Sequence, residues 1–164
     1  MPLDYRTLFQ EMNEAGVDYM LIGGVAVNFY GIPRMTYDLD LMIALNSENI
    51  LKLLSRLSNW GYKPRAPVNP NDLADEKKRA IWIGEKNMKA FSFYHEKEAI
   101  GEIDILIDLP IPYEVFRERA KVFDLEGTSV PVVSVQDLID LKRRAGRKQD
   151  VSDMEHLKAV LEKK

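Results

Sequence analysis

A glycine pair followed by an Asp-x-Asp pair constrains this chain more than any other feature. Gly23 and Gly24 follow an apolar run typical of a buried strand, and Asp38 and Asp40 lie one residue apart inside a second apolar run. Alternate residues of a strand point to the same face, so both carboxylates project together and the leucines beside them face the core. Burying paired carboxylates is costly unless a cation neutralises them. The pattern therefore predicts a divalent-cation site whose partner is a phosphate-bearing substrate.

Each half of this pattern also has a plainer explanation. The aspartates alone fit the exposed end of an edge strand with solvated carboxylates, and the glycines alone fit a tight turn between a strand and a helix. Together they favour a ligand site, because glycine lets the backbone approach a ligand closely and helix N-terminal N–H groups bind anions. Such a site would place an anion cradle and a cation site on neighbouring strands.

A third carboxylate is available on a later apolar run. Glu102, Asp104 and Asp108 alternate with apolar residues between positions 102 and 108. Asp104 is central in this run, and we expect it to complete the acidic site. The alternative is an amphipathic strand whose polar face lies in water.

Composition limits the class of protein. The chain has 164 residues, 46% of them hydrophobic and 30% charged, which fits one folded domain over residues 1–164 with C-terminal helices from about 134. The net charge of −3 requires any nucleic-acid binding to depend on a local basic patch. The absence of cysteine excludes a disulfide framework, a thiolate zinc site and a cysteine nucleophile. No membrane span or signal-peptide pattern is apparent, so we expect a cytoplasmic protein without a membrane partner.

Hydrophobic periodicity and turn residues predict an α/β (α+β) fold with a mixed, twisted sheet flanked by helices. We expect a long loop over 63–76 and a turn over 84–87. The expected helices cover 3–15, 24–30, 46–59, 113–120, 134–145 and 151–161. The expected strands cover 18–22, 38–44, 79–83, 89–94, 102–107, 122–125 and 130–133.

These motifs resemble the polymerase-β-like nucleotidyltransferase superfamily. Its signature is a hydrophobic residue before Gly-Gly or Gly-Ser, then Asp-hydrophobic-Asp/Glu, and a later strand that bears a third carboxylate. The segment 31–36, Gly-Ile-Pro-Arg-Met-Thr, and the segment 138–153 from Leu138 to Asp153 are similar to those of stand-alone nucleotidyltransferases of the abortive-infection toxin type. The resemblance spans about residues 17–161.

The resemblance implies a mechanism. Asp38 and Asp40 would ligate two Mg²⁺ (or Mn²⁺) ions, and Asp104 would complete the site that activates the acceptor hydroxyl. The hydroxyl would attack the α-phosphorus of an NTP in line, and pyrophosphate would leave.

The resemblance also implies which residues bind the nucleotide. Gly23 and Gly24 would hold the triphosphate, Arg34 and Thr36 lie close enough in sequence to reach phosphates, and Lys142 is the best candidate from the basic cluster at 142–148. A solvated helix end whose cations complement the helix dipole is the plainer explanation of that cluster. We expect Asp150 and Asp153 to cap the last helix and to pair with basic side chains.

The acceptor and the partners stay open at this stage. We expect the acceptor to be either RNA, such as a tRNA end, or a protein side chain, and an antitoxin is a candidate partner. The sequence does not define the oligomeric state. The alternative function keeps the fold without turnover, as a non-catalytic nucleotide-binding or partner-binding protein.

Overall fold

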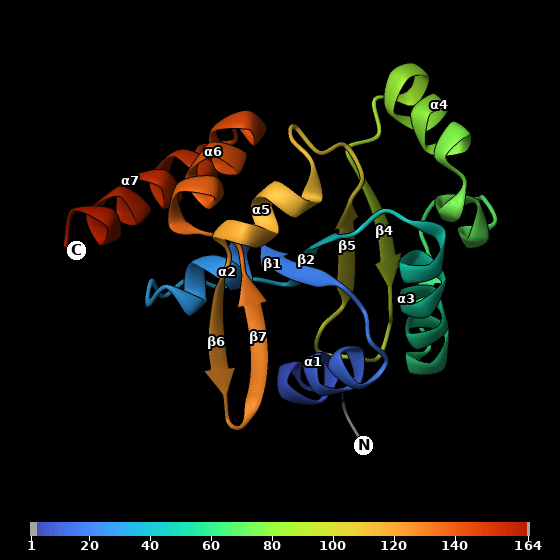
Figure 1. The fold of residues 1–164 in the computed structure, drawn as a ribbon, viewed down its shortest axis with the longest axis horizontal. Helices are drawn as coiled ribbons and strands as arrows, with labels where there is room; N and C mark the ends of the chain where they lie inside the picture. Colours follow the sequence, from blue (N-terminus) through green and yellow to red (C-terminus); the bar gives the residue numbers. More distant parts are fainter. Residues whose placement is uncertain (1–2, 164) are drawn as a thin grey trace.

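The computed structural model describes residues 3–163, and these form seven α-helices, one 3₁₀ helix and seven strands (Figure 1). The helices are α1 (Tyr5–Glu14), α2 (Gly23–Phe29), α3 (Ser47–Trp60), η1 (Pro70–Ala74), α4 (Glu76–Lys86), α5 (Tyr113–Arg119), α6 (Val135–Ala145) and α7 (Lys148–Glu162). The strands are β1 (Tyr19–Ile22), β2 (Asp38–Ile43), β3 (Lys63–Pro64), β4 (Ala90–Tyr94), β5 (Glu102–Leu106), β6 (Lys121–Leu125) and β7 (Thr128–Val132).

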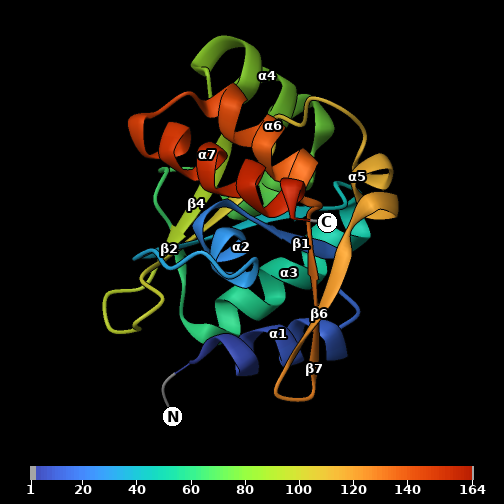
Figure 2. The same cartoon turned by 90° about the vertical axis from the view of Figure 1, so that its left-hand side faces the viewer.

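The strands form one mixed sheet in the order β3-β4-β5-β2-β1-β7-β6. The pairs β2–β5 and β1–β7 are parallel, and the remaining neighbours are antiparallel. Figure 2 shows α1 and α3 on one side of the central strands and α6 and α7 on the other. The expected fold class, a mixed sheet flanked by helices, is confirmed.

Strand alternation explains how the sheet separates a core from a polar face. In β2, Leu39 and Leu41 are fully buried, whereas the aspartates between and before them are only partly buried. The apolar stripe of α3, which includes Ile50, Leu53 and Leu57, is buried in the same core. Asn46 caps this helix by accepting a hydrogen bond from the Asn49 N–H.

The segment 76–87 corrects two expectations. We predicted a strand at 79–83 and a turn at 84–87, but these residues form α4 and its C-cap. Asp75 begins the helix, because its carboxylate accepts hydrogen bonds from the N–H groups of Lys77 and Lys78. Trp82 is buried, and the left-handed Asn87 ends the helix. A four-residue apolar run does not distinguish a buried strand from a helix, and here the capping residue decides.

Two further boundaries differ from expectation. The expected loop over 63–76 contains the short strand β3 and the helix η1. The last helix begins at Lys148, three residues before the expected start, because Asp150 and Arg147 form a capping box there. Within residues 3–163, every helix is too short or too polar to span a bilayer.

Candidate functional site

The pairing of β2 with β5 brings the acidic residues together. The two strands are parallel, with Asp38 opposite Glu102 and Asp40 opposite Asp104. All four side chains therefore lie on the face of the sheet opposite to the buried leucines and isoleucines. Oxygen atoms of Asp38, Glu102 and Asp104 lie within 4.8 Å of one another. We call these four residues the acidic cluster.

Mutual repulsion and burial act together in the acidic cluster. Burial raises the pKa of Asp40, and the charges of Asp104 and Asp38 raise it further, while Lys142 opposes them. Burial likewise raises the pKa of Asp104, with Glu102 and Asp38 adding to the effect. The pKa of Asp38 is also raised by burial and by Glu102. Without a cation, the cluster resists full ionisation.

Gly23 leaves the space that the Asp40 carboxylate occupies. A Cβ atom at position 23 would lie 2.1 Å from Oδ2 of Asp40, and the backbone of Gly23 has φ +70°. Both the left-handed backbone and the contact exclude a side chain. The glycine therefore places the start of α2 directly against the acidic cluster.

Gly24 likewise leaves space for the side chains of the segment before β2. A Cβ atom there would lie 3.0 Å from Oγ1 of Thr36 and 3.3 Å from Cζ of Arg34. The Thr36 hydroxyl donates a hydrogen bond to the Asp38 carbonyl oxygen over 3.0 Å. The structure thus brings Arg34 and Thr36 to the first turn of α2, beside the acidic cluster.

A second group of acids, Asp150 and Asp153, lies on α7, and nearby cations neutralise it. Lys142 Nζ lies 3.2 Å from Oδ1 of Asp150 and 3.1 Å from Oδ2 of Asp153. Arg34 pairs with Asp153, and Arg147 Nε pairs with Oδ2 of Asp150 over 2.8 Å. Hydrogen bonds from Arg147 and Lys142 outweigh burial and lower the pKa of Asp150. We call these five residues the neutralised network. Asp150 caps α7 and pairs with basic side chains, as expected. Asp153 pairs with Arg34 and Lys142 but takes no part in the cap, which corrects that part of the expectation.

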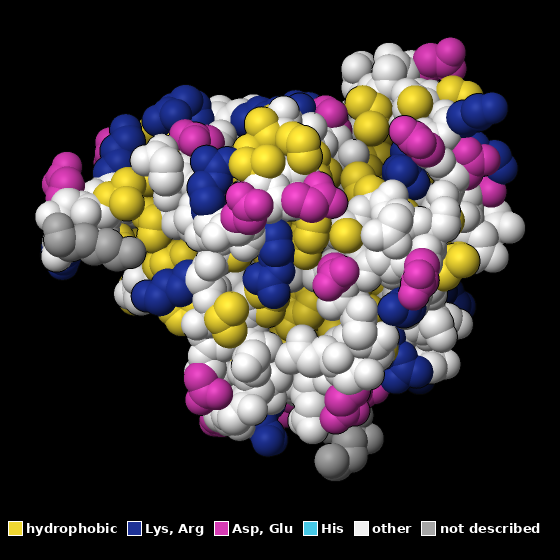
Figure 3. Space-filling view, in the orientation of Figure 1, with side chains coloured by type: hydrophobic (Ala, Val, Ile, Leu, Met, Phe, Trp, Pro, Cys, Tyr) yellow, Lys and Arg dark blue, Asp and Glu magenta, His cyan; other side chains and the backbone are white. Residues whose placement is uncertain are grey.

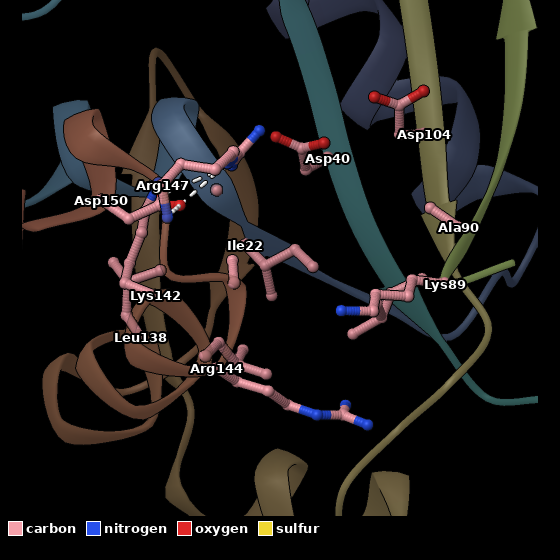
Figure 4. A pocket seen from close by; sticks show the side chains of 14 residues that line it. Ile22, Asp40, Lys89, Ala90, Asp104, Leu138, Lys142, Arg144, Arg147 and Asp150 are labelled. Atoms are coloured by element: carbon pink, nitrogen blue, oxygen red, sulfur yellow. Dashed lines mark hydrogen bonds and ion pairs between the residues drawn. The ribbon is translucent and has the colours of Figure 1, made fainter. Parts of the chain in front are cut away.

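Asp40 and Asp104 of the acidic cluster line one pocket of about 350 Å³ together with three members of the neutralised network, Lys142, Arg147 and Asp150 (Figure 4). Asp40 and Asp104 lie at one end of it, and Lys89 and Arg144 lie toward the other. Leu138 and Leu141 of α6 supply an apolar wall. Lys142 is buried rather than solvated, so the plainer explanation of that lysine is wrong. Arg144 is tied to the end of β5 by an ion pair of 2.9 Å with Asp108.

The residues of the acidic cluster fit a divalent cation. Carboxylate oxygens are the ligands that Mg²⁺ and Mn²⁺ prefer. Among residues 3–163, Oδ1 of Asp104 is buried without a hydrogen-bond partner, which is costly in the absence of a positive ligand. The raised pKa values of Asp38, Asp40 and Asp104 have the same explanation, since a cation between these groups would remove the repulsion.

Sequence reasoning identified three members of the acidic cluster and missed the fourth. Glu102 stands two residues before Asp104, as Asp38 stands before Asp40. This repeated acid-apolar-acid pattern was the available signal. Only the strand register reveals that Glu102 lies opposite Asp38.

A mixed sheet that carries paired strand carboxylates beside a glycine turn defines a nucleotidyltransferase-like protein. Residues 6–157 match the family model described as "Nucleotidyl transferase AbiEii toxin, Type IV TA system". The chain belongs to this family of nucleotidyltransferases, which confirms the resemblance found in the sequence. No curated protein matches the chain significantly.

Solved structures share the fold at low sequence identity. The chain is similar to the lincomycin-bound lincosamide adenylyltransferase LnuA, with TM-score 0.64, 17% identity, and coverage of 98% of this chain and 99% of that one. It is similar to ANT(2")-Ia in complex with adenylyl-2"-tobramycin, with TM-score 0.61, 13% identity, and coverage of 94% and 85%. It is also similar to a putative nucleotidyltransferase from Thermotoga maritima, with TM-score 0.57, 15% identity, and coverage of 97% and 91%.

Proposed function

We propose that this protein transfers an NMP group from an NTP to a hydroxyl of RNA, such as a tRNA end, or of a protein, and that the reaction depends on Mg²⁺ or Mn²⁺. The observation that carries the proposal is the acidic cluster. Asp38, Asp40 and Asp104 share one face of the sheet, and Asp40 and Asp104 line a pocket there. No cation among the described residues neutralises them to the extent seen at Asp150.

In this proposal Asp38, Asp40 and Asp104 hold the divalent ions. The bound ions would supply charge neutralisation for the triphosphate and would favour deprotonation of the acceptor hydroxyl. The protein contributes position: β2 and β5 form a rigid base, and Gly23 fixes Asp40 by leaving it room. No covalent nucleophile is required.

The triphosphate would lie between the acidic cluster and the neutralised network. Gly23 and Gly24 open the first turn of α2, and Ile22 as its N-cap contributes no side-chain hydrogen bond in the described structure. Arg34 and Thr36 lie against this turn at Gly24, and Lys142 lines the same pocket as Gly23. In the neutralised network three cations face two carboxylates, which leaves one positive charge in excess to attract phosphate.

We infer the class of acceptor from the toxin family and not from the shape of the pocket. A toxin that moves a nucleotide acts most directly by modifying a cellular macromolecule, so we propose RNA or protein as acceptor. The structural neighbours include proteins bound to lincomycin and to adenylyl-2"-tobramycin, so a small hydroxylated acceptor is a useful comparison. We further propose that an antitoxin accompanies this chain in the cytoplasm.

The test is label transfer. The wild-type protein is incubated with each α-labelled NTP and Mg²⁺ or Mn²⁺, with total RNA, protein extract or lincomycin as separate acceptors. We expect label in the RNA or protein arm and release of pyrophosphate. Asp38→Ala should abolish transfer, whereas Asp140→Ala, on the exposed side of α6, serves as the matched control. Absence of transfer from every nucleotide, or transfer unaffected by Asp38→Ala, would contradict the proposal.

A non-catalytic nucleotide-binding or partner-binding protein remains the competing function, because the same pocket could hold Mg-NTP without turnover. Calorimetry with Mg-NTP separates the two. Tight binding without pyrophosphate release in any acceptor arm would favour the binding protein, and pyrophosphate release would favour the enzyme.

A further inference from the structure

Glu102 lies among the proposed metal ligands, although the sequence pattern did not single it out. Its carboxylate belongs to the group of oxygens from Asp38, Glu102 and Asp104 that lie within 4.8 Å of one another. Its side chain is 17% exposed, so it is largely removed from water. Asp38 faces it directly across the β2–β5 pair.

Arg65 is the counter-ion of Glu102. The guanidinium reaches from beyond β3, at the edge of the sheet, and Nε of Arg65 pairs with Oε1 of Glu102. The same guanidinium lies over the Tyr94 ring, with Cζ 4.9 Å from the ring centroid. The Arg65 side chain is 52% exposed, so solvent surrounds half of it. Because its side chain lies at the surface, Arg65 can separate from Glu102 without disturbing the core.

Stability does not explain this arrangement. An exposed ion pair contributes at most about 1 kcal/mol. Glu102 lies directly opposite Asp38 on the paired strands, and like charges in this position are destabilising. An apolar residue at position 102 would avoid that repulsion. The position of Glu102 is best explained by a cation that the acidic cluster receives in use.

We propose that Glu102 is a further ligand of the metal centre and that Arg65 is the counter-ion which it exchanges for the bound metal. The inference rests on the proposed function, because it concerns the same divalent ions. Arg65 would lower the affinity of the empty site for metal by competing for Glu102. Displacement of Arg65 would then leave a guanidinium beside Tyr94, next to the reaction centre, free to contact an incoming phosphate-bearing acceptor.

The charge balance supports this exchange. The four carboxylates of the acidic cluster carry four negative charges when ionised, which two divalent cations would balance. Three carboxylates would leave an excess of positive charge before the triphosphate arrives. Arg65 compensates one carboxylate only, on the solvent side of the cluster.

The experiment measures Mn²⁺ binding by electron paramagnetic resonance, without any turnover. Wild type is compared with Glu102→Gln, Arg65→Met and the double variant, with Asp104→Asn as the reference for loss of a ligand. Arg143→Met is the control, since Arg143 pairs with Asp140 on an exposed helix surface and lines no part of the pocket. Thermal melts of each variant establish that it is folded.

We expect Glu102→Gln to weaken Mn²⁺ binding about tenfold, at least the loss that follows removal of an outer-shell partner. Arg65→Met should tighten it about two- to fivefold, the factor that matches release of one exposed ion pair. The double variant should bind as Glu102→Gln does, because Arg65 then has nothing to compete for. Arg143→Met should match the wild type.

Failure of the inference and failure of the proposed function give different results. If Asp104→Asn loses Mn²⁺ while Glu102→Gln keeps wild-type affinity, the inference is wrong and the proposed function stands. If wild type binds no Mn²⁺ with or without NTP, the metal-dependent function itself is wrong. Weaker binding by Glu102→Gln in a protein without transferase activity would support the inference and contradict the enzyme.

Discussion

The protein contains two groups of buried acids a short distance apart, and they are treated in opposite ways. Asp150 and Asp153 on α7 are surrounded by Arg34, Lys142 and Arg147, and the pKa of Asp150 is lowered. Asp40 and Asp104 on the sheet face other carboxylates, and their pKa values are raised. Figure 3 shows Lys and Arg side chains on the surface over α6 and α7, interspersed with Asp and Glu side chains.

We infer that this difference separates residues that hold the fold together from residues that take part in the chemistry. A buried carboxylate paired with cations holds elements together, here α6, α7 and the segment before β2. A buried carboxylate without such partners costs stability, and a fold keeps it where a ligand supplies the missing charge. We infer that the same residue type has two roles here, and that its charged neighbours distinguish them.

The largest effect should come from removing a carboxylate of the acidic cluster. Asp104→Asn or Asp38→Asn should reduce NMP transfer at least about a thousandfold, the upper range for loss of one preorganised electrostatic contact. The fold should survive, because the amide relieves repulsion. Initial-rate assays with circular dichroism of each variant check this. A folded Asp104→Asn variant that transfers NMP at nearly the wild-type rate would contradict a catalytic role for the acidic cluster.

The second effect concerns the neutralised network. Asp150→Asn leaves the buried Lys142 with less compensation and should lower the free energy of unfolding by about 3 kcal/mol, as expected for breaking a buried pair. Asp140→Asn breaks an exposed pair on the surface of α6 and should cost less than about 0.5 kcal/mol. Urea denaturation measures both. Equal costs for the two variants would show that burial of the pair contributes nothing.

The third effect has the opposite sign. Asp40→Asn should raise the Tm of the metal-free protein by about 2–4 °C at pH near 7.5, the shift that corresponds to about 1 kcal/mol in a domain of this size. The reason is that the substitution removes a charge that burial and Asp104 disfavour. Differential scanning calorimetry after chelation checks it. A lower Tm would mean that the ionised Asp40 stabilises the fold.

The fourth and smallest effect is a dependence on pH. Because the folded-state pKa of Asp40 is raised, its ionisation costs stability as pH rises through that value, and the cost is absent below the pKa of the unfolded chain. The advantage of Asp40→Asn should therefore shrink as pH falls from about 7, the folded-state pKa, toward 3.8, the value of an unperturbed aspartate. The folded-state pKa of Asp150 is lowered, so the deficit of Asp150→Asn should persist over this range and shrink only in stronger acid. Parallel melts of both variants would show the two trends, and identical trends would contradict the assignment.

Much of this contrast was predictable from local sequence. The Asp-x-Asp alternation in a strand, the glycine turn before it and the capping Ser134 of α6 depend on residues close in the chain. The acidic residues Asp38, Asp40 and Asp104 were selected on that basis, and the structure brings them together.

The rest depends on pairing between distant segments. No feature of the local sequence indicates that β5 pairs in parallel with β2. The same is true of the register, which places Glu102 opposite Asp38. Burial of Lys142 arises because α7 packs on α6 and brings Asp150 and Asp153 to it. The strand expected at 79–83 was wrong because the Asp75 cap decides in favour of a helix, and a short apolar run permits either structure.

The central claim is that the acidic cluster, and not the neutralised network, receives divalent cations. Anomalous diffraction from crystals grown with Mn²⁺ and a non-hydrolysable NTP tests it directly. The account predicts manganese peaks within ligating distance of Asp38, Asp40 and Asp104, with Lys142 and Asp150 still paired. Peaks at Asp150 and Asp153, or none beside the sheet carboxylates, would contradict it.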